Sequence, residues 1–282
     1  MLGLTLLATT AGAGRYGDFS IQNDSSDIRD CSDYRITSNG ERLQMVTEEV
    51  PVSGTVRINS APHGGVFIRG GANRTTVTAC KAATLAGGRQ IRITNQNGEI
   101  SAEGPTGEHW AVFYIVRTAR GADVAAETVN GPITVRDFEG HVTARAVNGP
   151  IALRDSSGTI DLNTTNGPIA ITGSAGDVKA RAQNGPVSVK LPTGSWNGNL
   201  DASTQNGPLS VRLPNGFRSG VVVESLGRSP ITCVVEGCPE TKRRYLYDHE
   251  DRERVRRIEL GSGPANVRLS TQNGPVSVKE LE

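Results

Sequence analysis

The chain has 282 residues, of which only 4% are aromatic and 34 are glycine, and its formal net charge is +1. So few large side chains argue against one or two ordinary globular domains, whereas an elongated repeat domain needs only a thin stack of Val, Ile, Leu and Ala. The near-zero net charge provides no attraction toward nucleic acid or an anionic membrane surface, so we expect neither as a partner.

Residues 1–13 resemble an export signal. Residues 2–8 form a short apolar run, and the Ala-Gly-Ala at 11–13 is typical of a small-residue cleavage site. The positively charged lead-in of such signals is missing, so a truncated start and a disordered tail remain alternatives. No other stretch approaches the roughly 20 apolar residues that span a membrane. We expect a mature protein without an integral membrane segment, located outside the cytoplasm in the periplasm, at the cell surface or secreted.

Residues 14–51, rich in Asp, Ser and Asn, are expected to form a linker and a strand that leads into a repeat. From residue 131 the repeat is visible as glycines nine residues apart, resuming after a shift of four: Gly131, Gly140, Gly149, Gly158, Gly167, Gly176, Gly185, Gly194, then Gly198, Gly207 and Gly216. A fixed period indicates a repeat architecture. Counted from glycine, the third and fifth residues of each unit are apolar and the fourth is polar or small, which is the alternation of a strand.

Two kinds of unit alternate, so the full repeat is 18 residues with two short strands. One kind begins with Asn-Gly-Pro and the other with Gly and a polar residue. Because proline has no N–H to donate across a tight hairpin, we expect a corner in which Asn and Gly have positive φ and Pro opens the next strand. Equivalent strands would then stack about 4.8 Å apart, with an asparagine ladder along one edge.

These features predict an all-β, single-domain parallel β-solenoid (β-helix) over residues 52–280. Weaker strands occur at 54–59, 65–69 and 75–79. Two segments are expected to interrupt the repeat: 101–120, which contains a strongly apolar strand, and 217–262, which is charged. The latter and the N-terminal segment are interpreted as caps at the two ends.

Four cysteines are present, and their even number favours an oxidising compartment. Cys233 and Cys238 are separated by five positions around a turn that a disulfide could close, which leaves Cys31 and Cys80 as the remaining pair. The alternative, a zinc site, lacks support from a Cys-x2-Cys motif or a neighbouring histidine pair.

Motifs for catalysis or for metal and cofactor binding are not found. Calcium-binding nonapeptides repeat an Asp in each unit, but here Asp137 and Asp155 are followed at the equivalent position by Gly173. Asp161 and Lys179 are 18 residues apart, and we expect a surface ion pair of small energetic value rather than a catalytic dyad. The histidines lack ligand spacing: His63, His109, His141 and His249. We therefore expect no catalytic residue, no metal and no cofactor.

Three stretches are similar to the bacterial "putative adhesin" β-solenoid family, a domain of uncharacterised function. They are Val-Arg-Ile-Asn at 56–59 with Gly-Gly-Val-Phe-Ile-Arg-Gly at 64–70, the later Thr-x-Asn-Gly-x-Ile-x-Val units, and Leu-Ser-Thr-Gln-Asn-Gly-Pro-Val-Ser-Val at 269–278. The resemblance covers about residues 28–280. It implies an exported or surface-associated β-solenoid and assigns no catalytic residues.

The sequence thus favours a non-enzymatic, adhesin-like protein with a binding or structural role at the cell envelope or surface. Its partner, whether a surface, a glycan or a protein, is unknown. One alternative is a self-assembling structural polymer, because the open ends of a solenoid expose unpaired strand edges. Another is a polysaccharide-active enzyme, because parallel β-helices host such enzymes, although short turns and few aromatics disfavour it.

Overall fold

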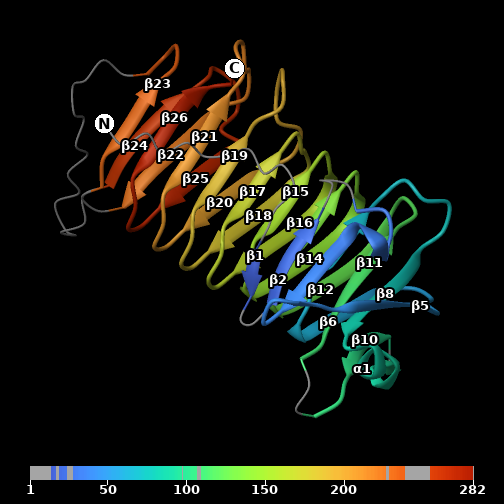
Figure 1. Cartoon of the computed structure of the whole chain (residues 1–282). Coiled ribbons are helices and arrows are strands. Elements are labelled where there is room, and N and C mark those ends of the chain that lie inside the picture. The colour runs from blue at the N-terminus through green and yellow to red at the C-terminus, as the bar shows by residue number, and fades with distance from the viewer. Residues whose placement is uncertain are drawn as a thin grey trace.

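The computed structural model describes residues 14–16, 19–23, 28–96, 98–106, 109–226, 229–238 and 255–281. The predicted signal at 1–13, His249 and much of the predicted 217–262 interruption lie outside these residues. The described part is all-β, with 26 strands, one helix, α1 (Leu85–Gln90), and a short 3-10 helix at Cys31–Asp33. Figure 1 shows an elongated arrangement of strands lying across the long axis of the molecule.

Most strands belong to two large sheets of eleven strands each. Sheet 1 runs in spatial order through β24 (Val255–Leu260), β22 (Val221–Leu226), β25 (Val267–Thr271), β20 (Leu200–Thr204), β18 (Asp177–Ala182), β16 (Ser157–Thr164), β14 (Glu139–Asn148), β12 (Ala122–Asn130), β6 (Val56–His63), β10 (Glu99–Glu103) and β9 (Arg92–Gln96). Sheet 2 runs through β23 (Ile231–Val234), β26 (Val276–Glu280), β21 (Leu209–Leu213), β19 (Val187–Lys190), β17 (Ile169–Thr172), β15 (Ile151–Arg154), β13 (Ile133–Arg136), β7 (Val66–Arg69), β11 (Ala111–Arg117), β8 (Thr76–Ala83) and β5 (Gln44–Val50).

The central strands of both sheets are parallel and keep one register. In sheet 2, Ile151 lies opposite Ile133 on one side and Ile169 on the other. In sheet 1, Ile160 lies between Val142 and Val178 in the same way. Each of these residues therefore pairs with the residue 18 positions along the chain, which is the period of the sequence.

One apolar core fills the space between the two sheets. It is built from the third and fifth positions of the units, so that successive strands contribute side chains that are at most 1% exposed, such as Val142, Ala144, Ile151, Leu153, Ile160 and Leu162. Burial of alternate residues on a strand leaves the intervening ones on the outer face. The core therefore decides which side chains the outer faces display.

Asn-Gly-Pro corners differ from the expectation in their backbone conformation. Neither the Asn nor the Gly of these corners has a positive φ, so that prediction was wrong. Left-handed values occur instead at the other kind of corner, for example 91° at Gly176, and at Asp137 and Asp155. Glycine is needed at the Asn-Gly-Pro corners because a Cβ on Gly149 would lie 2.0 Å from the carbonyl oxygen of Gly131. Close approach of stacked corners explains the repeated glycine.

The expected asparagine ladder is present at the same corners. The side-chain amide of Asn148 donates to Oδ1 of Asn130 over 3.0 Å, and that of Asn166 donates to Asn148 over 2.9 Å. The ladder continues through Asn184, Asn206 and Asn273. Beneath it, the buried hydroxyl of Thr164 donates to the carbonyl oxygen of Gly149 over 3.1 Å. These bonds satisfy polar groups that stacking would otherwise leave unpaired.

At both ends, the order of strands in space differs from their order in the chain. β25 and β26 lie between β20/β21 and β22/β23, although β22 and β23 precede them in sequence. At the other end, β6 and β7 lie between β10/β11 and β12/β13. Further antiparallel strands are added at the edges: β24 on β22, β9 on β10, β8 on β11 and β5 on β8, whereas the edge strand β23 is parallel to β26.

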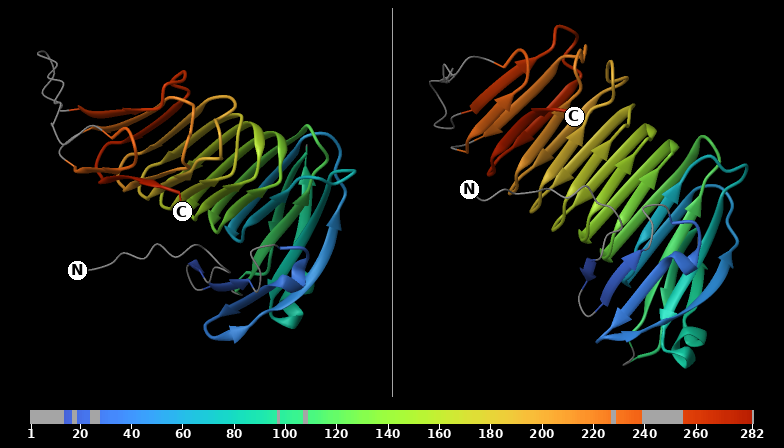
Figure 2. Two further views of the ribbon diagram at one scale, coloured as in Figure 1. Left: turned by 90° about the horizontal axis from the view of Figure 1, so that it is seen from above. Right: turned by 45° about the horizontal axis from the view of Figure 1, so that its top comes forward.

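A four-stranded antiparallel sheet comprises β1 (Gly14–Tyr16), β2 (Phe19–Asn23), β3 (Tyr34–Ser38) and β4 (Glu41–Arg42). Figure 2 shows it beside the end of sheet 2 that contains β8 and β11. A second apolar cluster joins the two, and within it the ring centroids of Tyr34 and Phe113 are 4.9 Å apart. The disulfide between Cys31 and Cys80 links the same parts of the chain.

Candidate functional site: a row of basic residues

The six strands of sheet 2 that follow Asn-Gly-Pro, β13, β15, β17, β19, β21 and β26, each display two residues on their outer face, the fourth and the sixth of the unit. The fourth is always small: Thr134, Ala152, Ala170, Ser188, Ser210 and Ser277. The sixth is basic in every unit but one, and the β-strand register aligns these residues from strand to strand. We refer to the aligned cations as the basic row: Arg69, Arg136, Arg154, Lys190, Arg212 and Lys279, with Thr172 between Arg154 and Lys190.

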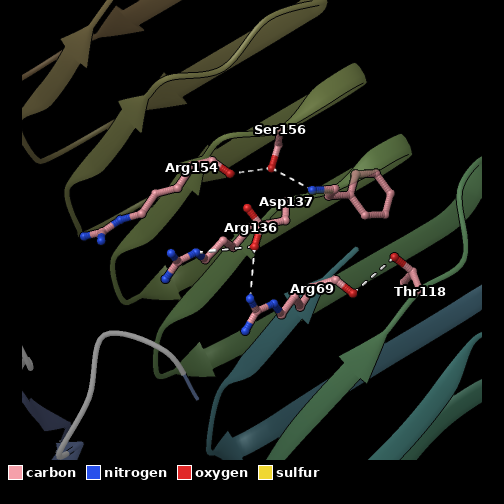
Figure 3. Close-up of polar contacts among 7 residues, drawn as sticks. Arg69, Thr118, Arg136, Asp137, Arg154 and Ser156 are labelled. Atoms are coloured by element: carbon pink, nitrogen blue, oxygen red, sulfur yellow. Dashed lines mark hydrogen bonds and ion pairs between the residues drawn. The ribbon is translucent and has the colours of Figure 1, made fainter. Parts of the chain in front are cut away.

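The alternation of the strands places the basic row on the outside. Val135, Leu153 and Val189 precede row members and are fully buried in the core. The next side chain along each strand must then point to the opposite face. Figure 3 shows the guanidinium groups of Arg69, Arg136 and Arg154 directed to the same side of the sheet.

Stacking like charges in register is unfavourable for folding. Arg136 lies directly opposite Arg154, and Arg212 lies directly opposite Lys279. Neighbouring cations on adjacent strands repel each other, and like charges directly opposite are destabilising. Neither core packing nor strand pairing needs a cation at these outward positions, as Thr172 demonstrates in the same row.

An aspartate offsets the charge at one end of the basic row. Oδ2 of Asp137 is 3.3 Å from a terminal nitrogen of Arg69 and 3.5 Å from Nε of Arg136 (Figure 3). Asp137 has φ of 50° and directly follows β13, and Asp155 occupies the equivalent place after β15 with φ of 47°. The equivalent residues next to the row on β17, β19 and β21 are Gly173, Leu191 and Leu213, which carry no charge, whereas the equivalent residue on β26 is Glu280.

In the other half of the basic row, the acid at the equivalent position, Glu280, does not form an ion pair with a row member in the described part of the chain. Within the part of the chain that the structure describes, Lys190, Arg212 and Lys279 form no ion pair. Their positive charge is therefore directed to solvent along β19, β21 and β26, beside the small side chains of the fourth positions.

The outer face of sheet 1 is different, because its charges alternate in sign. One of its aligned columns reads Asp161, Lys179, Asp201 and Arg268. In another, Arg145 and Glu127 form an ion pair of 3.3 Å. Asp161 does lie opposite Lys179, as the spacing suggested, but the expected ion pair between them is not formed in the described ranges. The net charge of +1 thus hides an unequal distribution between the two faces.

Other residues considered from the sequence do not assemble into a site. The cysteines form two disulfides, Cys31–Cys80 and Cys233–Cys238. In the described ranges, no three His, Cys, Asp or Glu side chains come together as metal ligands; His109 and His141 are exposed. Trp196 is buried, and its indole N–H donates to the carbonyl oxygen of Gly176 over 2.9 Å. None of the helices in the described ranges has the length and apolar character required to cross a bilayer.

Sequence reasoning missed the basic row. The third, fourth and fifth positions of the units indicate the core and the seventh excludes calcium, but none of them contains the row, and the overall net charge conceals it. The signal was present one position beyond the fifth: the sixth residue of the Asn-Gly-Pro units is Arg136, Arg154, Thr172, Lys190, Arg212 or Lys279. Reading the charge of each aligned column, rather than of the whole chain, would have found it.

Comparisons with known proteins give only weak structural similarity. No protein-family model matches the chain, and no curated protein does. Among solved structures, a "putative adhesin" from Parabacteroides distasonis is 9% identical with a TM-score of 0.38, covering 84% of this chain and 97% of its own. A "putative adhesin" from Bacteroides fragilis is 11% identical with a TM-score of 0.36 and the same coverage.

A "putative lipid binding protein" from Parabacteroides distasonis is 9% identical, with a TM-score of 0.32, and covers 84% of this chain and 97% of its own. Because identities and TM-scores are this low, we take no function from these proteins.

Proposed function

We propose that this protein is an exported, non-enzymatic β-solenoid of the adhesin-like type, which binds a surface polymer at the cell envelope through the outer face of sheet 2. The observation that carries the proposal is the basic row on a face of small side chains. A continuous flat face of this kind offers many weak, repeated contacts, whereas an enzyme needs a few groups converging on one reacting bond. The cations of the row are spread over successive strands and do not converge.

The solenoid description is supported by the constant register of 18 residues in both sheets. One strand of sheet 1 and the next strand of sheet 2 form one coil, and coils stack along the long axis. Export is supported by the two disulfides, which persist in oxidising compartments and are rare in the cytosol.

End-to-end polymerisation is the weaker alternative. Such stacking would continue the parallel register from one molecule to the next. Three of the four outermost strands, β24 at one end and β9 and β5 at the other, are antiparallel to their neighbours and break that register; the fourth, β23, is parallel to β26.

The proposal is tested with the oxidised mature protein and isolated cell-wall sacculi. Retention on the sacculi and release of soluble sugars are measured together, and a panel of purified glycans is assayed in the same way. We expect retention without released products. Released sugars would overturn the non-enzymatic assignment, and absence of retention on every surface would overturn the envelope-binding role.

A further inference from the structure

We propose that the basic row binds a linear acidic polysaccharide, which lies along the row and across the strands of sheet 2. The inference rests on the proposed function and specifies its ligand class. Between Arg136 and Lys279 the row crosses six strands, from β13 through β15, β17, β19 and β21 to β26. At about 4.8 Å per strand, this length is about 24 Å, which suits an extended polymer better than a small anion.

The shape of the face agrees with a polymer chain. Small side chains flank the basic row at Ala170, Ser188, Ser210 and Ser277. They allow a ligand backbone to approach the sheet closely while its acidic groups reach the cations. Each contact is weak by itself, but successive groups of one polymer bind at a high effective concentration once the first is held. A row of cations therefore selects for repeated negative charge.

Nucleic acid fits this face less well than an acidic polysaccharide. Phosphates of one B-DNA strand advance by about 3.4 Å along the helix axis and wind around it, whereas row members on adjacent strands are about 4.8 Å apart and stay on one face of the sheet. Proteins that bind single strands combine cations with aromatic stacking platforms. The fourth and sixth positions from β13 to β26 contain no aromatic residue.

The half of the row beyond Thr172 should provide most of the affinity. Asp137 already contacts Arg69 and Arg136, and it would repel an incoming anion. Lys190, Arg212 and Lys279 have no carboxylate within ion-pair distance among the described residues. An acidic polysaccharide would supply the carboxylates that these three cations lack.

The critical variant replaces these three cations by threonine: Lys190→Thr, Arg212→Thr and Lys279→Thr. Thr172 occupies the same place in β17, so the strands accept threonine there. The control variant makes the same change of net charge on sheet 1: Lys179→Thr, Arg181→Thr and Arg268→Thr, all three exposed. Thermal unfolding of both variants establishes that they are folded before binding is measured.

Binding is measured to immobilised polygalacturonate, dextran sulfate, neutral dextran, and single- and double-stranded DNA over a range of salt concentrations. We expect the intact protein to bind the acidic polysaccharides and not neutral dextran. The sheet 2 variant should lose affinity about tenfold or more, and its dependence of log K on log salt should weaken by up to about three units. The sheet 1 variant should bind within about twofold of the unmodified protein.

Equal losses in both variants would overturn the inference, because only net charge would then matter. Equal binding to neutral dextran would also overturn it, as would tighter, row-dependent binding to DNA. If the sheet 2 variant is still fully retained on sacculi, the basic row is not the binding site, although the envelope role stands. If acidic polysaccharides bind through the row but sacculi retain nothing, the ligand class stands and the envelope role fails.

Discussion

At the scale of single residues, the glycines of the Asn-Gly-Pro corners act through close approach rather than through backbone freedom. In the Asn-Gly-Pro corners a Cβ on Gly167 would lie 2.1 Å from the carbonyl oxygen of Gly149. The atom in the way belongs to the backbone of the neighbouring corner, and this backbone cannot move without disturbing the pairing of the stacked strands. Gly216, by contrast, has φ of 69°, and a Cβ at this position would meet no atom within 4 Å.

This difference predicts a large loss of stability at Gly167 and a small one at Gly216. Gly167→Ala should lower the free energy of unfolding by more than about 3 kcal/mol, because it forces stacked corners apart. Gly216→Asn should cost about 1 kcal/mol, because asparagine tolerates left-handed φ better than most residues. Urea unfolding of the two variants measures both values. A larger cost at Gly216 would show that φ, and not close approach, limits the choice of residue.

Tyr114 has a different constraint, because its ring lies in the core and its hydroxyl has no hydrogen-bond partner within the described part of the chain. Burial, together with the charge of Glu48, raises the pKa of this phenol far above its ordinary value. The folded protein therefore holds the neutral form. Because the unfolded chain would ionise Tyr114 near pH 10, the stability that depends on the neutral phenol is fully present below that pH and is lost as the pH rises above it.

Tyr114→Phe should accordingly be neutral or stabilising at pH 7, by up to about 2 kcal/mol, since it removes a buried unpaired hydroxyl. It should also make the fall in stability above pH 10 less steep than in the unmodified protein. Denaturant unfolding at pH 7, 9 and 10.5 provides the comparison. If the free energy of unfolding falls equally steeply above pH 10 in both proteins, the pKa of Tyr114 does not change on unfolding.

At the scale of elements, the sequence predicted the repeated strands well, because their signal is local. The apolar third and fifth positions alternate with outward ones, and β12 to β21 follow that pattern through the core. The asparagine ladder follows from the same period. The conformation of the Asn-Gly-Pro corners was not predictable in this way, because the contact that selects glycine, Gly149 against Gly131, is between strand pairs.

The end elements were harder to predict for the same physical reason. The sequence of residues 263–281 predicts a strand but not its partners. β25 lies between β20 and β22, and the alternation of its residues would fit pairing with either strand alone equally well. The basic row was hidden for another reason: its members are 18 or more residues apart, and acids elsewhere in the chain balance their charge in the total. Long-range pairing must be known before such a column can be recognised.

Two disulfides join these end elements over very different loop lengths. The Cys31–Cys80 bond spans a sequence separation of 49 residues and the Cys233–Cys238 bond a separation of 5. In the chain-entropy description, removing the disulfide that closes the longer loop lowers stability by about 4 kcal/mol, and removing the one that closes the shorter loop lowers it by about 2 kcal/mol. Cys31→Ala/Cys80→Ala should therefore destabilise the end near β8 more than Cys233→Ala/Cys238→Ala destabilises the end near β23.

Hydrogen exchange of the two double variants tests this prediction, because it reports on each end separately. Protection should fall mainly in β5, β8 and β3 in the first variant, and in β23 in the second. The opposite order of losses would show that the turn at Cys233, not the longer loop, depends more on its cross-link.

At the scale of the whole molecule, stability is expected to depend on neighbouring contacts, as in other stacked repeats. β25 is an exception to stacking in chain order. It pairs with β20 on one side and, on the outer side, with β22, which precedes it in the sequence. Leu269 on β25 is 1% exposed and lies opposite Ala202 of β20 on one side and Val223 of β22 on the other. A defect at Leu269 should therefore affect a strand that precedes it by more than 40 residues in the chain.

Leu269→Ala leaves a cavity that should cost about 2–5 kcal/mol. We expect hydrogen exchange to accelerate in β22 and β25, while β14 and β16 keep their protection. Leu153→Ala in β15 serves as the matched control, since it removes the same atoms from the middle of sheet 2. Undiminished protection of β22 in the Leu269 variant would mean that the outer strands are held by something other than β25.

The interior position of β25 and β26 also constrains the order in which the protein can be completed during synthesis or transport. Strands β22 and β23 emerge first, but their parallel neighbours are β25 and β26, which emerge tens of residues later. A simple stack could close one turn after another as the chain appears. Here β22 and β23 cannot pair with their parallel neighbours until the chain is available up to residue 280. During translocation, this end would therefore stay unfolded until almost all of the 282 residues had crossed.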